Sequence, residues 1–293
     1  MRGSFRHAAA VLAALAALAS SAMAADRAVP AAPPPPAAAN PFDVAFGAFL
    51  ASDFIYRGFS ISDRGPSVGA YVVPRYEWLY AGLTAISVDL PFRPDALLDF
   101  YAGLRPVLGP VVLDMRVTYY HFPNSVTPGT NIPQKYDYWQ GHVRPAWTVN
   151  ETLTLAVHGS HAVSFANTGA TETLLSGSAI VRAPGTWLPT GIAAYASGEV
   201  GHQWIGTTDT GANLPDYLFW NVGGGLVYKA FTLDLRYHDT NMSREECAIL
   251  TGDLGATPGG VPSALNPLGL RSNWCSAAIV GRLSFDMSLS RLR

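Results

Sequence analysis

The chain has 293 residues, of which 49% are hydrophobic and only 14% are charged. Soluble proteins ordinarily carry about 25% charged residues, so this chain is poor in charge for a soluble protein. After residue 24, however, no stretch reaches the roughly 18 consecutive apolar residues that a transmembrane helix needs. With 19 Lys and Arg against 21 Asp and Glu, the chain also lacks the strong basic excess of a nucleic-acid-binding protein. An ordinary soluble domain, a helical membrane protein and a nucleic-acid-binding protein are therefore all disfavoured.

The N-terminus, residues 1–24, has the features of a secretory signal peptide. It carries Arg2 and Arg6 at its start, continues through an alanine-rich run at 8–19, and ends in Ala-Met-Ala, which fits a small-residue cleavage site. The mature chain is expected to begin at Ala25. Loss of the two signal arginines leaves the mature chain mildly acidic.

The next segment, 25–42, is rich in proline and alanine. Such a composition favours an extended polyproline conformation and does not pack as a core. We expect a semi-rigid periplasmic linker in front of one further domain, which spans 43–293.

That domain is predicted to be all-β, because runs of roughly ten residues alternate apolar and polar side chains. Alternation places one set of side chains on each face of a strand. The pattern predicts a transmembrane antiparallel up-and-down β-barrel of about twelve strands. The predicted strands are 43–57, 66–78, 80–88, 97–107, 110–122, 135–147, 152–163, 172–182, 190–204, 216–228, 230–240 and 273–288.

The connections between these strands alternate between short turns and longer polar loops. Outer-membrane barrels have short periplasmic turns and long external loops, so both termini are predicted to be periplasmic in a multi-pass outer-membrane protein. Tryptophans fall near both ends of the strands, as expected for two interfacial girdles. Those predicted at the inner girdle are Trp78, Trp147 and Trp187, and those at the outer girdle are Trp139, Trp204, Trp220 and Trp274.

The longest loop carries both cysteines of the chain, Cys247 and Cys275. An even number of cysteines in an exported chain predicts a disulfide, which would tie the loop between the last two strands. Two free thiols are the alternative. Metal binding by two cysteines alone is weaker, because a closed zinc site needs about four ligands. No metal or cofactor is predicted.

Charged side chains of the strands are expected to face the lumen, since a charge on the lipid face costs about 2–4 kcal/mol at mid-bilayer. Most of them fall in the periplasmic half of the predicted strands, and Asp53, Arg57 and Asp99 are predicted nearer the outer mouth. The predicted pore-lining residues are Asp53, Arg57, Arg75, Glu77, Arg105, Asp114, Arg116, Arg144, Arg182, Asp234, Arg236, Arg282 and Asp286.

A short charged motif occurs twice: Leu-Asp-Met-Arg at 113–116 and Leu-Asp-Leu-Arg at 233–236. Both copies begin odd-numbered strands six strands apart, so they are predicted at equal height on opposite walls. They would form a charged constriction that selects solutes by sign, or an internal salt-bridge network that fills the lumen. The two interpretations are compatible, and a slight arginine excess favours anions.

The first predicted strand carries Ser-Asp-Phe-Ile-Tyr-Arg-Gly-Phe-Ser at 52–60, followed by Gly-Pro-Ser at 65–67. This stretch resembles the N-terminal signature of the TorF-type family of proposed porins, also called the Gcw_chp outer-membrane protein family. A late cysteine pair is similar too. The resemblance implies a single outer-membrane barrel with pore activity.

The predicted function is therefore a narrow passive channel for small polar or anionic solutes. Its expected partners are outer-membrane lipid, lipopolysaccharide and the barrel-assembly machinery. One alternative is a structural or adhesive barrel with a filled lumen. Another is a lipid hydrolase using His158, Ser160 and His161, but no acid is assigned beside them, so no enzyme activity is predicted.

Overall fold

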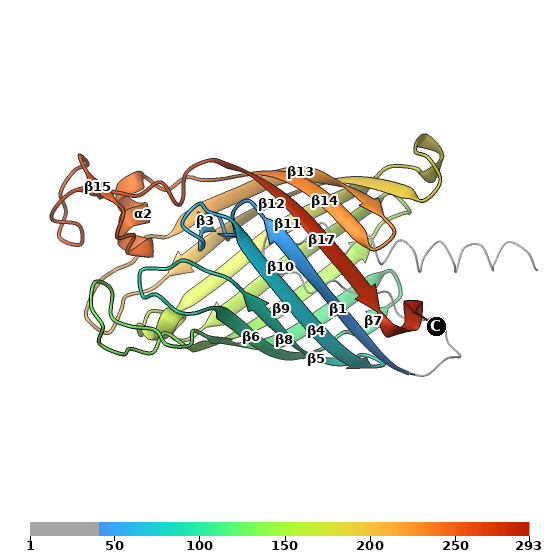
Figure 1. Cartoon of the computed structure of the whole chain (residues 1–293), viewed down its shortest axis with the longest axis horizontal. Helices are drawn as coiled ribbons and strands as arrows, with labels where there is room; N and C mark the ends of the chain where they lie inside the picture. The colour runs from blue at the N-terminus through green and yellow to red at the C-terminus, as the bar shows by residue number, and fades with distance from the viewer. Residues whose placement is uncertain (1–40, 293) are drawn as a thin grey trace, which may run out of the picture.

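The computed structural model describes residues 41–292, so the predicted signal peptide and nearly all of the linker lie outside the described residues. These residues form a closed barrel of twelve long strands (Figure 1). The strands are β1(Phe42–Ala51), β4(Ser67–Tyr76), β5(Leu79–Ile86), β6(Leu97–Leu104), β8(Val111–His121), β9(Tyr138–Thr148), β10(Leu153–Ala162), β11(Glu172–Arg182), β12(Ile192–Ile205), β13(Tyr217–Tyr228), β14(Phe231–Thr240) and β17(Ala278–Ser288).

Each long strand pairs antiparallel with its neighbours in the chain, and β1 pairs with β17 to close the cylinder. The two-residue strand β7(Val107–Leu108) adds only a short pairing to β8. The predicted up-and-down barrel of twelve strands is confirmed. The first and last strands are shorter than predicted, because β1 ends at Ala51 and β17 begins at Ala278.

Side-chain alternation separates the two faces of the barrel wall. In β14, Leu233 and Leu235 are 57% and 61% exposed, whereas their neighbours Asp234 and Arg236 are 8% and 3% exposed. The side chains that point outward are mainly apolar, whereas the charged side chains of the strands point into the lumen. An apolar exterior around a polar interior is the arrangement of an outer-membrane β-barrel.

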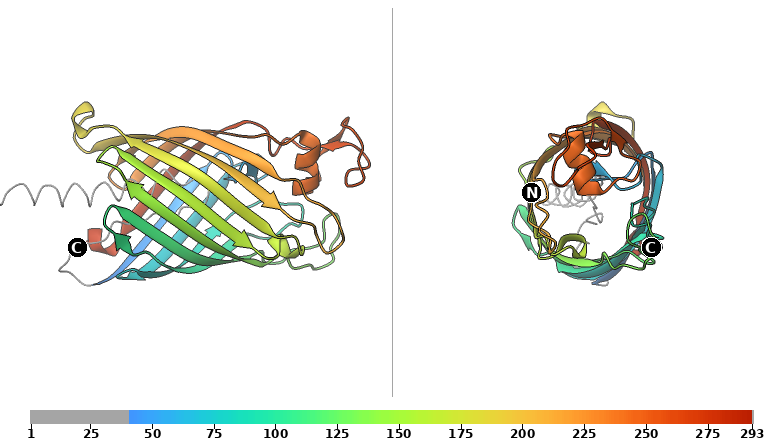
Figure 2. Two further views of the ribbon diagram at one scale, coloured as in Figure 1. Left: turned by 180° about the vertical axis from the view of Figure 1, so that it is seen from behind. Right: turned by 90° about the vertical axis from the view of Figure 1, so that its left-hand side faces the viewer.

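The two ends of the barrel differ in their connections (Figure 2). The short-turn end carries the connections 77–78, 105–110, 149–152, 183–191 and 229–230, including the 3-10 helix η2(Gly185–Trp187). The long-loop end carries 52–66, 87–96, 122–137, 163–171, 206–216 and 241–277. Ala45 pairs with Ser288, so the barrel begins and ends at the short-turn end.

The long-loop end contains most of the smaller elements. These are β2(Ile55–Tyr56), β3(Phe59–Ser60), η1(Phe165–Asn167), α2(Arg244–Thr251), β15(Thr257–Pro258) and β16(Leu270–Arg271), whereas η3(Leu289–Arg291) follows β17 at the other end. No helix among the described residues is long and apolar enough to cross a membrane.

The last loop, 241–277, is built around α2. The helix begins with a capping box between Ser243 and Glu246 and ends at Gly252, whose φ of 63° is left-handed. A disulfide joins Cys247 of this helix to Cys275, which precedes β17, and this confirms the predicted pair. Figure 2 shows α2 lying over part of the barrel opening.

The largest apolar cluster lies inside the barrel toward the long-loop end. It joins the inward-facing side chains of the wall to the short β2–β3 segment and to the disulfide. Trp274 belongs to this cluster and is only 4% exposed, so its predicted place in the outer girdle is wrong. Trp139 and Trp187, by contrast, are 60% and 77% exposed.

Candidate functional site in the barrel lumen

A hairpin folded into the lumen is the main feature that the strand pattern did not reveal. After β1 the chain turns inward, and β2 and β3 pair with each other instead of with the wall. Their turn consists of Arg57 and Gly58, with φ of 46° and 92°. Positive φ at both central residues is what a two-residue hairpin turn of type I′ requires. We call residues 52–63 the lumen hairpin.

Gly58 lets the tip of the lumen hairpin reach the barrel wall. A Cβ atom at this position would lie 2.4 Å from Cγ2 of Thr240 and 2.8 Å from Cβ of Phe219. Because those atoms belong to β14 and β13, any larger residue would push the tip away from the wall. The glycine of the family-like signature therefore has a packing role as well as a turn role.

The Arg57 guanidinium fixes the tip to four adjacent strands. Its Nη1 donates to Glu172 Oε1 of β11 at 3.0 Å and to Gln203 Oε1 of β12 at 3.3 Å. Its Nη2 donates to Gln140 Oε1 of β9 at 3.0 Å and to Ser160 Oγ of β10 at 2.9 Å. The Arg57–Glu172 ion pair is almost completely buried, with each side chain 2% exposed. A single side chain thus attaches the hairpin to one side of the lumen.

Asp53 stabilises the base of the lumen hairpin. Its Oδ1 accepts hydrogen bonds from the hydroxyls of Ser60 and Ser62 at 2.6 and 2.9 Å. The Ser62 hydroxyl in turn accepts from the Phe54 amide at 2.9 Å. The aspartate of the signature therefore holds the two arms together, at the long-loop end.

The last loop covers the lumen hairpin. The Trp274 indole nitrogen donates to Asp63 Oδ1 at 2.7 Å, and the Ser60 amide donates to the Trp274 carbonyl at 2.9 Å. The Arg64 guanidinium donates to the carbonyl oxygens of Ser276 and Ala277 at 2.8 and 2.9 Å. These contacts connect the disulfide-closed loop to the hairpin, and to Arg64 directly after it, through three residues next to Cys275.

The lumen toward the short-turn end is lined by charged side chains. The two copies of the charged motif lie as predicted: Asp114 and Asp234 are each the fourth residue of their strand, and β8 and β14 lie six steps apart around the barrel. Arg105 donates to Asp114 at 2.6 Å, and Arg236 donates to Asp234 at 3.0 Å. Both aspartates are therefore neutralised by an arginine, as the salt-bridge interpretation expected.

Tyrosine hydroxyls reach the same aspartates across an intervening strand. Tyr195 of β12 donates to Asp234 of β14 at 2.6 Å and crosses β13 at Gly225. A Cβ atom at Gly225 would lie 2.6 Å from the Tyr195 hydroxyl, so the crossing needs glycine there. Tyr80 reaches Asp114 in the same way across Gly103. Each copy of the motif is thus positioned by a tyrosine two strands away.

The other predicted pore-lining residues are also placed in the lumen, with one exception. Glu77 lies in the turn between β4 and β5, exposed and with φ of 52°, so its predicted place on the lumen face is corrected. The reason is that β4 ends at Tyr76, the residue before Glu77, so Glu77 no longer belongs to the strand. Lumen-facing positions are held by Arg75, Arg105, Asp114, Arg116, Arg144, Arg182, Asp234, Arg236, Arg282 and Asp286.

Three acids of the lumen were missed by the sequence analysis. Asp43 binds Arg75, Glu172 binds Arg57, and Glu199 accepts from the Ser176 hydroxyl at 2.6 Å. All three lie on the polar face of a strand, so the alternation of polar and apolar residues could have predicted them. They reduce the cationic excess of the lumen.

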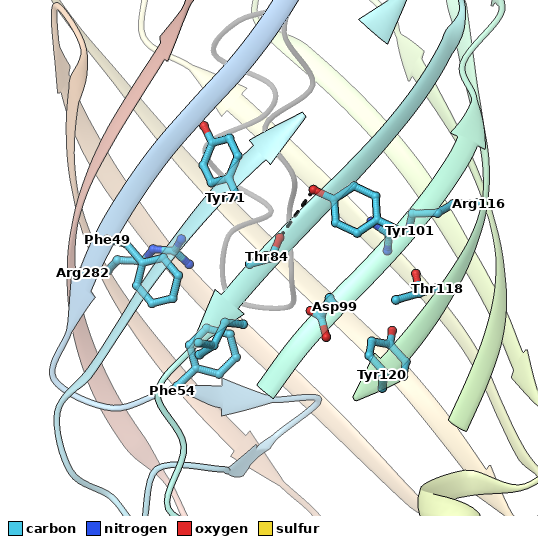
Figure 3. A pocket seen from close by; sticks show the side chains of 11 residues that line it. Phe49, Phe54, Tyr71, Thr84, Asp99, Tyr101, Arg116, Thr118, Tyr120 and Arg282 are labelled. Atoms are coloured by element: carbon cyan, nitrogen blue, oxygen red, sulfur yellow. Dashed lines mark hydrogen bonds between the residues drawn. The ribbon is translucent and has the colours of Figure 1, made fainter. Parts of the chain in front are cut away.

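A recess lies beside the lumen hairpin, on the wall opposite Arg57's partners (Figure 3). Its volume is about 460 Å³ including the open side. Arg116 of β8 and Arg282 of β17 stand on opposite sides of it, and Phe54 of the hairpin forms one end. It is lined by Phe49, Phe54, Tyr71, Thr84, Ile86, Asp99, Tyr101, Arg116, Thr118, Tyr120 and Arg282.

The residues weighed for hydrolysis have other contacts. Ser160 accepts from Arg57, His158 lies 3.3 Å from the Nδ1 of His142, and His161 contacts Thr173 at 2.8 Å. The described residues contain no group of three or more His, Cys, Asp or Glu side chains arranged to hold a metal ion.

Several solved structures are similar in fold, at low identity. The NanC porin is 7% identical, with a TM-score of 0.45 over 83% of this chain and 98% of that one. An outer-membrane channel from Pseudomonas putida F1 is 12% identical, with a TM-score of 0.43 over 86% and 97% of the two chains. OmpT of Vibrio cholerae is 11% identical, with a TM-score of 0.35 over 84% and 98%.

No curated protein matches the chain. A family of bacterial proteins of unknown function, Gcw_chp, matches residues 36–253. The match includes the whole lumen hairpin and eleven of the twelve long strands, all except β17, and so covers most of the barrel. The chain belongs to the Gcw_chp family.

Proposed function

We propose that the protein is a narrow outer-membrane channel for small polar solutes, with a preference for anions. The observation that carries the proposal is the lining of the lumen toward the short-turn end. There the inward positions hold many charged and hydroxyl-bearing side chains, whereas the other half contains the largest apolar cluster together with the buried network of Arg57. A lumen that is polar along half its length is suited to water and solutes.

Orientation follows from the general architecture of such barrels, whose long loops are external and whose short turns are periplasmic. The lumen hairpin then lies toward the cell exterior, and both termini are periplasmic. Solutes would meet the hairpin first and the charged half second. In this order, the hairpin would limit the size of the solutes that enter, and the arginines would then select them by charge.

Passage is proposed along the side of the lumen that carries the recess. Arg57 attaches the hairpin to β9, β10, β11 and β12. The recess lies against β1, β4, β5, β6, β8 and β17 instead. The free cross-section is therefore confined to one side, and small unit conductance is expected.

Single-channel recording tests the proposal. The mature full-length protein, folded into lipid and checked by its heat-dependent gel mobility, should give small, discrete current steps in a planar bilayer. A preparation that is folded by that criterion but gives no steps at any applied voltage would overturn the proposal.

A structural barrel without transport is the second candidate, and the buried Arg57 network favours it. Breaking a buried ion pair costs about 3–5 kcal/mol, so the hairpin is held firmly in place. In that case the long loops would carry the function, and the bilayer recording would stay silent.

A further inference from the structure

We propose that the recess beside the lumen hairpin is a binding site for a small organic monocarboxylate with an aromatic or flat apolar body. This inference rests on the proposed channel function and gives it a solute class. Four properties of the recess lead to it: unmet hydrogen-bond donors, opposed cations, an acidic neighbour and aromatic walls.

The first property is a pair of polar atoms that the described residues leave unsatisfied. Nε of Arg116 and Oγ1 of Thr118 are both buried, and neither has a hydrogen-bond partner among residues 41–292. Both side chains line the recess and stand two residues apart on the inward face of β8. Buried polar groups are nearly always hydrogen-bonded, so these two indicate a bound acceptor, either water or a solute.

The second property is charge. Arg116 and Arg282 lie on opposite sides of the recess (Figure 3). The guanidinium carbon of Arg282 lies 3.9 Å from the ring centre of Phe49, and that of Arg116 lies 5.5 Å from the ring centre of Tyr101. An anion between two guanidinium groups would be attracted to both and would accept charge-assisted hydrogen bonds.

The third property limits the ligand to a single negative charge. Asp99 also lines the recess and is only 3% exposed. A second carboxylate on the ligand would lie in the same small space as this acid and would be repelled. A monocarboxylate is therefore favoured over a dicarboxylate.

The fourth property is the shape and chemistry of the walls. Phe49, Phe54, Tyr101 and Tyr120 are each less than 9% exposed and line the same recess. Aromatic rings pack favourably against a flat apolar body. Inorganic phosphate would use the arginines but leave these walls without a contact.

Binding can be measured apart from transport. Benzoate is the probe, titrated by calorimetry into the folded full-length protein in detergent. Benzamide, which is the same size but neutral, and inorganic phosphate are the comparison probes. Benzoate should bind saturably and at least about tenfold more tightly than benzamide, the factor expected for one charge-assisted hydrogen bond. It should also bind more tightly than phosphate, which has no apolar body to pack against the aromatic walls.

Two substitutions locate the site. Arg116→Gln should weaken benzoate binding by at least about tenfold, and Thr118→Val by a few-fold, since each removes one of the unmet donors. Arg244→Gln, on the exposed loop helix, and Thr232→Val, on the lumen face of β14, are the matched controls. Both controls should bind benzoate as the unmodified protein does.

The inference is wrong if benzoate does not bind saturably, if benzamide or phosphate binds equally well, or if Arg116→Gln leaves the affinity unchanged. Should Arg116→Gln fail to fold, Arg116→Lys and Thr118→Val decide the outcome, since both should still weaken binding. Current steps without benzoate binding would reject this inference and leave the channel, whereas binding without current steps would reject the channel.

Discussion

Arg57 adopts a backbone conformation that is unfavourable for a residue with a side chain. Its φ of 46° lies in the left-handed region, at a cost of about 1–3 kcal/mol. Its buried pairing with Glu172 and its hydrogen bonds to three further strands offset this cost. Glu172 in turn accepts from Gln140 Nε2 at 2.6 Å, so the network depends on both charges.

Arg57→Ala should therefore free the lumen hairpin. We expect a loss of about 3–5 kcal/mol in the free energy of unfolding, because Glu172 would remain buried without the Arg57 guanidinium that balances its charge. If the hairpin constricts the channel, the unit conductance should rise as well. Denaturant unfolding in lipid and bilayer recording measure the two effects.

The matched control is Arg93→Ala, which removes an exposed loop arginine outside the lumen. Arg57→Leu combined with Glu172→Leu removes both charges and should recover part of the lost stability. Equal stability of Arg57→Ala and the unmodified protein would show that the buried pair does not hold the hairpin.

Residue identity alone predicted part of this site. Asp53 and Arg57 were expected near the outer mouth on the lumen face, and both lie inside the barrel toward the long-loop end. Their attachment to a separate hairpin was missed because Phe54 and Tyr56 continue the alternation of β1 without a break. A period of two is the same whether a strand joins the wall or folds inward.

At the scale of elements, the last loop and the lumen hairpin form one packed unit. The disulfide fixes Trp274 and the carbonyl groups that bind Arg64. The sequence predicted the cysteine pair, because exported chains pair their cysteines, but gave no sign that this loop contacts the first one. Closure of the barrel by β1 and β17 brings these two loops side by side, but the contacts between them depend on the conformation of each loop, which strand patterns do not specify.

Cys247→Ser combined with Cys275→Ser should loosen this unit. A bridge with a sequence separation of 28 is worth about 3–4 kcal/mol in the chain-entropy model. We expect a lower melting temperature and faster protease cleavage within 241–277, while the strand content seen by circular dichroism stays the same.

Reduction of the unmodified protein is the parallel measurement, and it should reproduce the effect of the double variant. The double variant itself should not respond to reductant. Unchanged cleavage of the loop in both would show that the contacts to Asp63 and Arg64 suffice without the bridge.

At the scale of the whole molecule, strand number and closure followed directly from the sequence. Twelve alternating runs correspond to twelve strands because lipid outside and water inside impose opposite chemistry on adjacent residues. The sequence did not predict which side chains fill the lumen or how they pair. The hydrogen-bond donors to a lumen charge can lie two strands away, as Tyr195 does from Asp234, and the alternation within a strand does not reveal them.

The balance of charge in the lumen should set ion selectivity. Arg116→Ala combined with Arg236→Ala removes two lumen cations and leaves Asp234 without its arginine. Selectivity should shift toward cations, because the negative lumen charges are then less balanced. The reversal potential in a potassium chloride gradient measures the shift.

Arg93→Ala combined with Arg244→Ala removes the same charge from exposed loop positions and should leave the reversal potential close to that of the unmodified protein. An unchanged potential in the lumen double variant would exclude Arg116 and Arg236 from the ion path.

The lumen hairpin also separates the order of synthesis from the order of assembly. Its contacts through Arg57 reach partners 83 to 146 residues later in the chain, and its contact with Trp274 spans 211 residues. A segment made near the start must therefore wait, without its partners, until almost the entire chain has been made. Such long-range contacts slow folding, so the first loop of the barrel is expected to be among the last parts to reach its final position.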